Sequence, residues 1–220
     1  AAERHTLWIA GLGAVVQMAS SAVLFFIMMA KRIYEYEFAL FWDINTAGSE
    51  RFSVTKQALV ILFCIGFVSF VSVLVANRTM ERRRSFYVSL LMALILGMNG
   101  MIIVTDLFSL YVFLEIAGIS SFVLIAMFQS KTGLEGSFKY LVMSCLASMF
   151  ILTGLSLIFM QTGSLKYSEI NIDLAGSPAR THPAYVYLAL ILLISGFAIK
   201  TGVVPFHSWL PDAHQSAYTA

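Results

Sequence analysis

Residues 107–128 read LFSLYVFLEIAGISSFVLIAMF, and this stretch decides the fold. It reaches the length of about 20 apolar residues that an α-helix needs to cross a hydrocarbon core of about 30 Å. Its apolar residues occupy both parities, whereas a strand of a membrane barrel alternates over about ten residues. Lipid offers no partners to backbone amides, and a helix satisfies them internally. The stretch therefore predicts a transmembrane helix that contains one carboxylic acid, Glu115.

Five further runs of the same kind lie on either side of this one. The chain is 59% hydrophobic and 12% charged, with a mean hydropathy of +0.83, which lies well beyond the values of soluble domains. The six predicted spans are residues 7–30, 57–76, 86–105, 107–128, 137–160 and 183–204. The predicted fold class is therefore all-α, a polytopic transmembrane helix bundle. Residues 1–220 are interpreted as a single transmembrane domain and as a fragment of a longer chain.

The linker between the second and third spans is rich in arginine. It contains Arg78, Arg82, Arg83 and Arg84. A dense positive charge in a short loop marks the cytoplasmic side of a membrane. The loop from Arg78 to Arg84 is therefore predicted to be cytoplasmic, in a cell inner membrane or an equivalent energy-transducing membrane. By alternation, the two longer loops lie on the opposite face.

Several classes of function are disfavoured by composition. The net charge of +2 is too weak to indicate a nucleic-acid partner. Cys64 and Cys145 lie far apart inside predicted spans, and we expect them to be buried, inert thiols. No nucleophile–base pair, phosphate loop or metal-ligand spacing is apparent. We therefore expect no catalytic site, cofactor or metal in this chain.

Glu115 is the first of two charged residues that the predicted spans place inside the membrane. It lies eight residues after Leu107, hence about 12 Å along the helix axis and near the middle of the bilayer. A charge at that depth costs at least about 2.5 to 3.5 kcal/mol, so Glu115 should face the interior of the bundle and have a partner. One interpretation is a place on an ion pathway. The other is a neutral carboxylic acid that hydrogen-bonds a neighbouring helix.

Lys200 is the second such residue, and a helix break is expected beside it. Gly196, Gly202 and Pro205 bracket this lysine. Proline removes a helical hydrogen bond, and unpaired carbonyls at membrane depth are tolerated only inside protein or beside a wet cavity. Discontinuous helices of this kind often carry transport sites. The alternative is a helix that ends near Val204, with the lysine side chain extending to the interface.

Glu115 and Lys200 together suggest a proton relay. Desolvation disfavours the charged form of an amine, while a nearby carboxylate favours it. A movable Glu115 would therefore switch Lys200 between holding and releasing a proton. For Lys139 and Asp106, each near the start of a predicted span, snorkelling or helix capping is the favoured interpretation.

His207 and His214 flank Asp212 near the end of the chain. Their spacing of seven residues does not fit a helical metal pair. We therefore expect proton-relay groups or polar lining rather than metal ligands.

Three motifs carry a resemblance to a known family. Residues 200–214 read KTGVVPFHSWLPDAH, residues 106–116 read DLFSLYVFLEI, and residues 138–140 read FKY. They resemble, in order and spacing, the antiporter-like, proton-conducting membrane subunits. These subunits occur in NADH-quinone oxidoreductase, energy-converting hydrogenases, formate hydrogenlyase and Mrp-type sodium/proton antiporters. The resemblance covers most of the chain from about Phe86 onward.

The resemblance implies a bundle of about fourteen helices with inverted five-helix repeats, each containing a broken helix. The six spans would be the second to seventh helices, so the chain would form one inverted-repeat half. Glu115 would be the glutamate of the fifth helix and Lys200 the lysine of the broken seventh. Lys139 would be an auxiliary group.

Three functions follow as hypotheses. The first is a proton-translocating subunit of a membrane-bound redox complex, of the hydrogenase or NADH/quinone oxidoreductase type. The second is a subunit of an Mrp-type antiporter, with sodium as a coupling ion, and the third is a structural membrane anchor that conducts nothing. The expected partners are the lipid bilayer, other integral membrane subunits and protons. The residues assigned to proton translocation are Glu115, Lys200, Lys139 and His207, with Asp106, Asp212 and His214 as accessory candidates.

Overall fold

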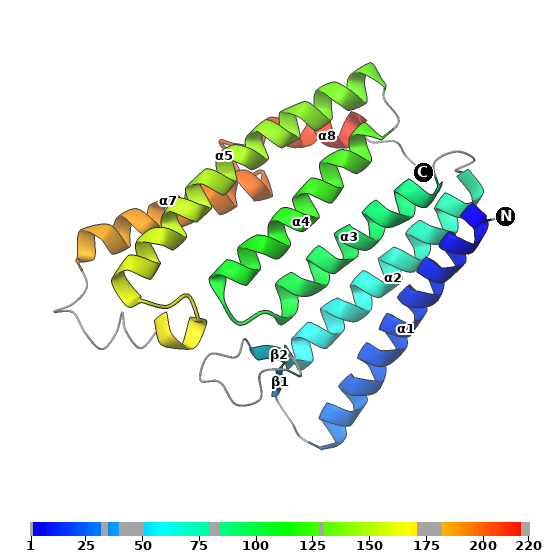
Figure 1. The fold of residues 1–220 in the computed structure, drawn as a ribbon, viewed down its shortest axis with the longest axis horizontal. Coiled ribbons are helices and arrows are strands. Elements are labelled where there is room, and N and C mark those ends of the chain that lie inside the picture. The colour runs from blue at the N-terminus through cyan, green and yellow to red at the C-terminus, as the bar shows by residue number, and fades with distance from the viewer. Residues whose placement is uncertain are drawn as a thin grey trace. The chain divides into compact units, whose positions relative to one another are not determined.

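The computed structural model describes residues 2–31, 35–39, 51–79, 84–127, 130–170 and 182–216. Its elements are α1 (Ala2–Ala30), β1 (Glu35–Ala39), β2 (Arg51–Thr55), α2 (Lys56–Thr79), α3 (Arg84–Ile103), α4 (Leu107–Ala126), α5 (Lys131–Thr162), α7 (Pro183–Thr201) and α8 (Trp209–Ser216) (Figure 1). Six of these helices, all but α8, are long and apolar enough to cross a membrane. The predicted all-α, polytopic membrane fold is confirmed.

The bounds of all six spans differ by a few residues from the prediction, and two of these differences lie near Lys139 and Lys200. Helix α5 begins at Lys131, where the Ser130 side chain accepts a hydrogen bond from the backbone N–H of Gly133. Its 32 residues correspond to about 48 Å, more than the hydrocarbon core requires. A search for apolar runs misses the first turns because they are polar and charged. Helix α7 ends earlier than predicted, at Thr201.

The described residues form two compact units, one up to Thr105 and the other from Asp106 onward. The prediction of a single transmembrane domain over residues 1–220 stays a prediction. In the first unit, α1, α2 and α3 contact one another. The side chains of Gln17 in α1 and Asn99 in α3 exchange hydrogen bonds of 3.0 and 3.1 Å, and Gln17 also donates to the carbonyl of Leu62 in α2. Polar side chains of this kind join transmembrane helices.

A β-hairpin lies in the first unit, within a stretch that was predicted to be a loop. Strands β1 and β2 pair antiparallel, with Glu35 opposite Thr55 and Ala39 opposite Arg51. Helix α2 follows β2 directly at Lys56. The hairpin therefore marks one end of α2.

In the second unit, α5 and α7 lie side by side (Figure 1). A Cβ added at Gly196 would lie 3.0 Å from the carbonyl oxygen of Ala147, and one added at Gly154 would lie 3.1 Å from that of Ala189. The order of these contacts shows that the two helices run antiparallel. Small residues at such crossings let helix backbones approach closely. The buried core at this interface consists of Ile151, Leu155, Ile158, Ala189 and Leu193.

Helix α4 is anchored at its start. The Asp106 side chain accepts a hydrogen bond of 2.7 Å from the backbone N–H of Ser109, which is an N-cap. Asp106 also forms a backbone bridge with Lys166, and the N–H of Leu107 donates to the carbonyl of Leu165. Capping, the role favoured for Asp106, is the role it has.

The expected helix break is present. Helix α7 ends at Thr201, Gly202 adopts the left-handed conformation with φ +67°, and α8 begins at Trp209. The N–H of Val203 returns to the carbonyl of Ala198 at 3.0 Å, which closes the helix end. The break therefore begins at glycine, before Pro205 is reached. Gly196 takes no part in it, because it lies inside α7.

The prediction of buried cysteines is wrong. Cys64 and Cys145 are free and exposed on their helix surfaces. Both lie in candidate membrane spans, where an exposed surface suits apolar side chains as well as a core does. The hydrophobicity of a span therefore does not tell whether a cysteine in it lies in the protein core or on the helix surface.

Candidate functional site

Glu115 and Lys200 meet in the second unit. The ammonium nitrogen of Lys200 lies 2.9 Å from Oε1 of Glu115, and we call these two residues the central pair. Glu115 comes from the middle of α4 and Lys200 from the last turn of α7. The Lys200 side chain therefore points to Glu115 on the neighbouring helix.

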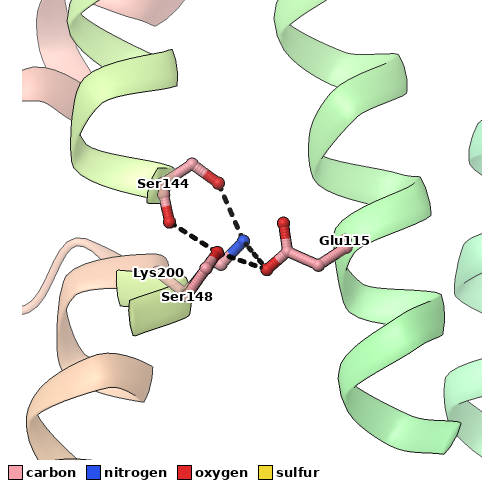
Figure 2. A network of polar contacts seen from close by, with 4 residues as sticks. All are labelled: Glu115, Ser144, Ser148 and Lys200. Carbon is pink, nitrogen blue, oxygen red and sulfur yellow. Dashed lines mark hydrogen bonds and ion pairs between the residues drawn. The ribbon is translucent and has the colours of Figure 1, made fainter. Parts of the chain in front are cut away.

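Two serines of α5 complete the cluster (Figure 2). The ammonium of Lys200 donates to Oγ of Ser144 at 2.8 Å, and the hydroxyl of Ser148 lies in hydrogen-bonding contact with Oε1 of Glu115. The serines are four residues apart, so they share one face of α5. Each charge of the central pair thus has a hydroxyl partner on the same helix.

The central pair is largely withdrawn from the surface of the second unit. The Lys200 side chain is 8% exposed and that of Glu115 is 21% exposed. Gly118 makes room for the amine, because a Cβ there would lie 3.6 Å from both Nζ of Lys200 and Oγ of Ser144. A larger side chain at Gly118 would compete with these polar groups for the same space.

The position of Lys200 also suits its charge. It lies in the last turn of α7, where the carbonyl ends of the helix favour a cation. Glu115 supplies the compensating negative charge, and serine hydroxyls can both donate and accept. The arrangement brings an amine, a carboxylate and two hydroxyls into direct contact.

A second cluster lies where α5 meets α8. The Lys139 ammonium lies 2.7 Å from Asp212 and 2.9 Å from Glu135, and we call these residues the α5–α8 cluster. The side chains are between 43% and 62% exposed, and they line an open pocket of about 390 Å³. The favoured interpretation of Lys139, snorkelling or capping, missed this pairing because Asp212 is distant in sequence.

The two histidines are not hydrogen-bonded to either cluster in the part of the chain that the structure describes. His207 and His214 are both exposed. Their predicted part in proton transfer stays a prediction. Within the described ranges, no group of three or more His, Cys, Asp or Glu side chains could hold a metal ion.

Ser144 and Ser148 were not among the site residues predicted from the sequence. The available signal was their spacing of four residues inside an apolar span, which places two hydroxyls on one helix face. It is a weak signal, because transmembrane serines commonly bond to their own helix. Ser156, for example, donates to the carbonyl of Leu152 at 2.8 Å.

Comparison with known proteins decides the family. Residues 104–220, more than half of the chain, match the family described as NADH:quinone oxidoreductase/Mrp antiporter, transmembrane. The chain belongs to this family. The suspected resemblance to antiporter-like membrane subunits is thereby confirmed.

Among curated relatives, the chain is 34% identical over 156 residues to NADH-quinone oxidoreductase subunit N of Desulforudis audaxviator. That match covers 71% of this chain and 30% of the relative. It is 30% identical over 206 residues to the corresponding subunit of Acidithiobacillus ferrooxidans, covering 93% of this chain and 40% of the relative. The chain therefore spans less than half the length of these relatives.

Two solved structures share the fold. A chain of the membrane-bound sulfane sulfur reductase, an archaeal respiratory membrane complex, superposes with a TM-score of 0.85 at 27% identity, over 96% of this chain and 42% of that chain. A chain of the Mrp complex from Dietzia sp. DQ12-45-1b superposes with a TM-score of 0.80 at 24% identity, over 98% of this chain and 39% of that one. The second likeness concerns the fold alone.

Proposed function

We propose that this chain is part of a proton-translocating, antiporter-like subunit of a membrane-bound redox complex, and that protons pass through the central pair. The observation that carries the proposal is the contact of 2.9 Å between Glu115 and Lys200 beside a helix break. An amine paired with a carboxylate inside candidate membrane spans fits an ion pathway better than a neutral acid that only joins helices.

The proposed step uses the charge on Glu115. While Glu115 is ionised and close, it stabilises the protonated amine of Lys200. When Glu115 moves away or takes up a proton, the ammonium loses its counter-charge in a poorly hydrated site, which favours the neutral amine. Lys200 then releases its proton. Ser144 and Ser148 hold both groups in reach of each other.

The relatives support the assignment to a complex. Curated relatives are named as a subunit of NADH-quinone oxidoreductase, and one similar structure is a respiratory membrane complex. We infer other integral membrane subunits as partners and an energy-transducing membrane as the location. The cytoplasmic loop from Arg78 to Arg84 is part of this proposal, although residues 80–83 lie outside the described residues.

The test is proton uptake by sealed vesicles that contain the complete complex. We expect Lys200→Ala and Glu115→Gln each to lower the rate at least tenfold, because each removes one partner of a pair that would exchange the proton. The matched controls are Lys166→Ala and Glu169→Gln, since these two residues form an exposed contact of 3.8 Å. The controls should retain full uptake.

Three outcomes would decide between the hypotheses. Unchanged uptake in both central-pair variants, with the complex assembled, would reject the relay and favour a structural anchor. Proton flux that requires sodium and needs no redox substrate would favour the Mrp-type alternative and reject the redox-complex assignment. Redox-driven uptake that is lost only in the central-pair variants would support the proposal.

A further inference from the structure

Helix α8 is fastened to α5 at two points. The Asp212 carboxylate pairs with Lys139 at 2.7 Å. One turn earlier, the indole of Trp209 stacks on the ring of Tyr140, with centroids 4.5 Å apart and an interplanar angle of 18°. Trp209 is 5% exposed, so its ring is enclosed as well as stacked. The start of α8 therefore has a defined position on α5.

Trp209 also reaches the end of α7. Its indole N–H donates to the carbonyl oxygen of Ile199 at 3.2 Å, in a buried contact. That carbonyl belongs to the peptide group that carries the amide nitrogen of Lys200. It also accepts from the N–H of Gly202, so two donors hold this one peptide plane. The next residue of α8, Leu210, packs against Gly202, where an added Cβ would lie 3.2 Å from Leu210 Cδ2.

A helix end inside a membrane has carbonyls without helical partners. The Ile199 carbonyl has one partner in the N–H of Gly202, and a second donor from outside the helix further stabilises this conformation. Here that donor comes from α8, and the peptide it holds leads directly into the lysine of the central pair. The direction of the Lys200 side chain depends on this peptide plane.

We propose that Trp209 is a positioning residue for Lys200: its indole N–H holds the Ile199–Lys200 peptide so that the amine reaches Glu115 and Ser144. The role of this contact in transport rests on the proposed function. The position of the amine itself can be tested without a transport measurement. Stacking on Tyr140 and the ion pair of Asp212 then act through Trp209, because they locate α8.

The experiment removes the N–H and keeps the ring. Trp209 is replaced in the complete complex by β-(3-benzothienyl)alanine, in which sulfur stands in place of the indole N–H. Trp209→Phe is a second variant that also lacks the donor. The matched control is Trp8→Phe, because Trp8 is 65% exposed on α1. Assembly of each complex is checked by size-exclusion chromatography.

The first readout is modification of Lys200 by an amine-reactive reagent, followed by mass spectrometry and normalised to Lys166, whose side chain is 37% exposed. We expect the isostere and Trp209→Phe to raise modification of Lys200 about fivefold, the factor that corresponds to loss of one hydrogen bond. Trp8→Phe should leave it unchanged. A role of the ring in packing alone would leave the isostere at the wild-type value and would overturn the inference.

The second readout is proton uptake, which separates this inference from the proposed function. If the amine becomes reactive in the isostere but Lys200→Ala still pumps, the positioning role stands and the relay fails. If Lys200→Ala abolishes uptake while the isostere protects the amine as the wild type does, the relay stands and the positioning role fails. Combined with Lys200→Ala, the isostere should lower uptake no further, and an additional loss would contradict action through Lys200.

Discussion

The two hydroxyls of the central cluster serve different charges. Ser144 accepts from the ammonium of Lys200, while Ser148 contacts the carboxylate of Glu115. Ser144 is buried, so a group that loses this contact finds little water to replace it. Hydrogen bonds to charged groups contribute about 1.5 to 3 kcal/mol.

We therefore expect Ser144→Ala to lower the rate of proton uptake roughly tenfold, in proportion to the lost stabilisation of the ammonium. The control is Ser156→Ala on the same helix, because the hydroxyl of Ser156 is exposed and bonds only its own backbone within the described contacts. Stopped-flow measurement of uptake compares the two variants. Equal rates would show that Glu115 holds the amine without help from α5.

At the scale of single residues, the sequence predicted the charged groups that lie inside an apolar span. Glu115 and Lys200 stood out because a charge in an apolar run is costly. Asp212 as the partner of Lys139 did not stand out, since the two residues meet only when α8 folds back onto α5. Ser144 and Ser148 were hidden by the commonness of serine in transmembrane helices.

The crossing of α5 and α7 depends on two glycines. A Cβ at Gly196 would lie 2.6 Å from Cγ1 of Ile151 and 3.0 Å from the carbonyl oxygen of Ala147. The second of these is backbone, so the helices would have to separate. Because Lys200 lies one turn beyond Gly196, separation there would also move the amine away from Ser144.

We expect Gly196→Ala to destabilise the packing of α5 on α7 by about 1 to 3 kcal/mol, the usual cost of overpacking. Gly13→Ala is the matched control, because a Cβ at Gly13 in α1 would meet only Met92 Cε at 4.0 Å. Thermal inactivation of the purified complex compares the variants. A Gly196→Ala complex as stable as the control would contradict the close approach.

The positions of the helices were predictable because a run of about 20 consecutive apolar residues is typical of a transmembrane helix. The break after Thr201 was predictable because glycine and proline stand together beside a charge. The hairpin of β1 and β2 was not, since two short strands in a mixed polar loop have no apolar face to signal them. The early start of α5 was missed for the related reason that polar helical turns resemble loops.

The topology of the chain can be tested across all its spans. Arg82→Cys should react with a membrane-impermeant maleimide from the cytoplasmic side, because the arginine-rich loop is expected there. Glu169→Cys should react only from the opposite side, since three candidate spans, α3, α4 and α5, separate it from that loop. The native Cys64 and Cys145 are exposed and must first be replaced. Labelling of both positions from the same side would refute the predicted orientation.

At the scale of the whole chain, the family could be recognised from three motifs, and the match over residues 104–220 confirms it. The inverted-repeat half remains an expectation, because the chain spans 30% to 40% of the relatives cited. Membership of the family concerns the second unit above all, which contains both the central pair and the α5–α8 cluster.

The sequence alone predicted the membrane class, the six helices, the helix break and the two residues of the central pair. Long apolar runs and charges inside them were the signals. These features depend on local cost: lipid penalises an unpaired charge or amide wherever it occurs in the chain. Which side chains contact one another became clear only from the folded structure. Lys139 with Asp212, and Trp209 with the carbonyl of Ile199, result from the return of α8 to α5 and α7, and no local rule specifies that return.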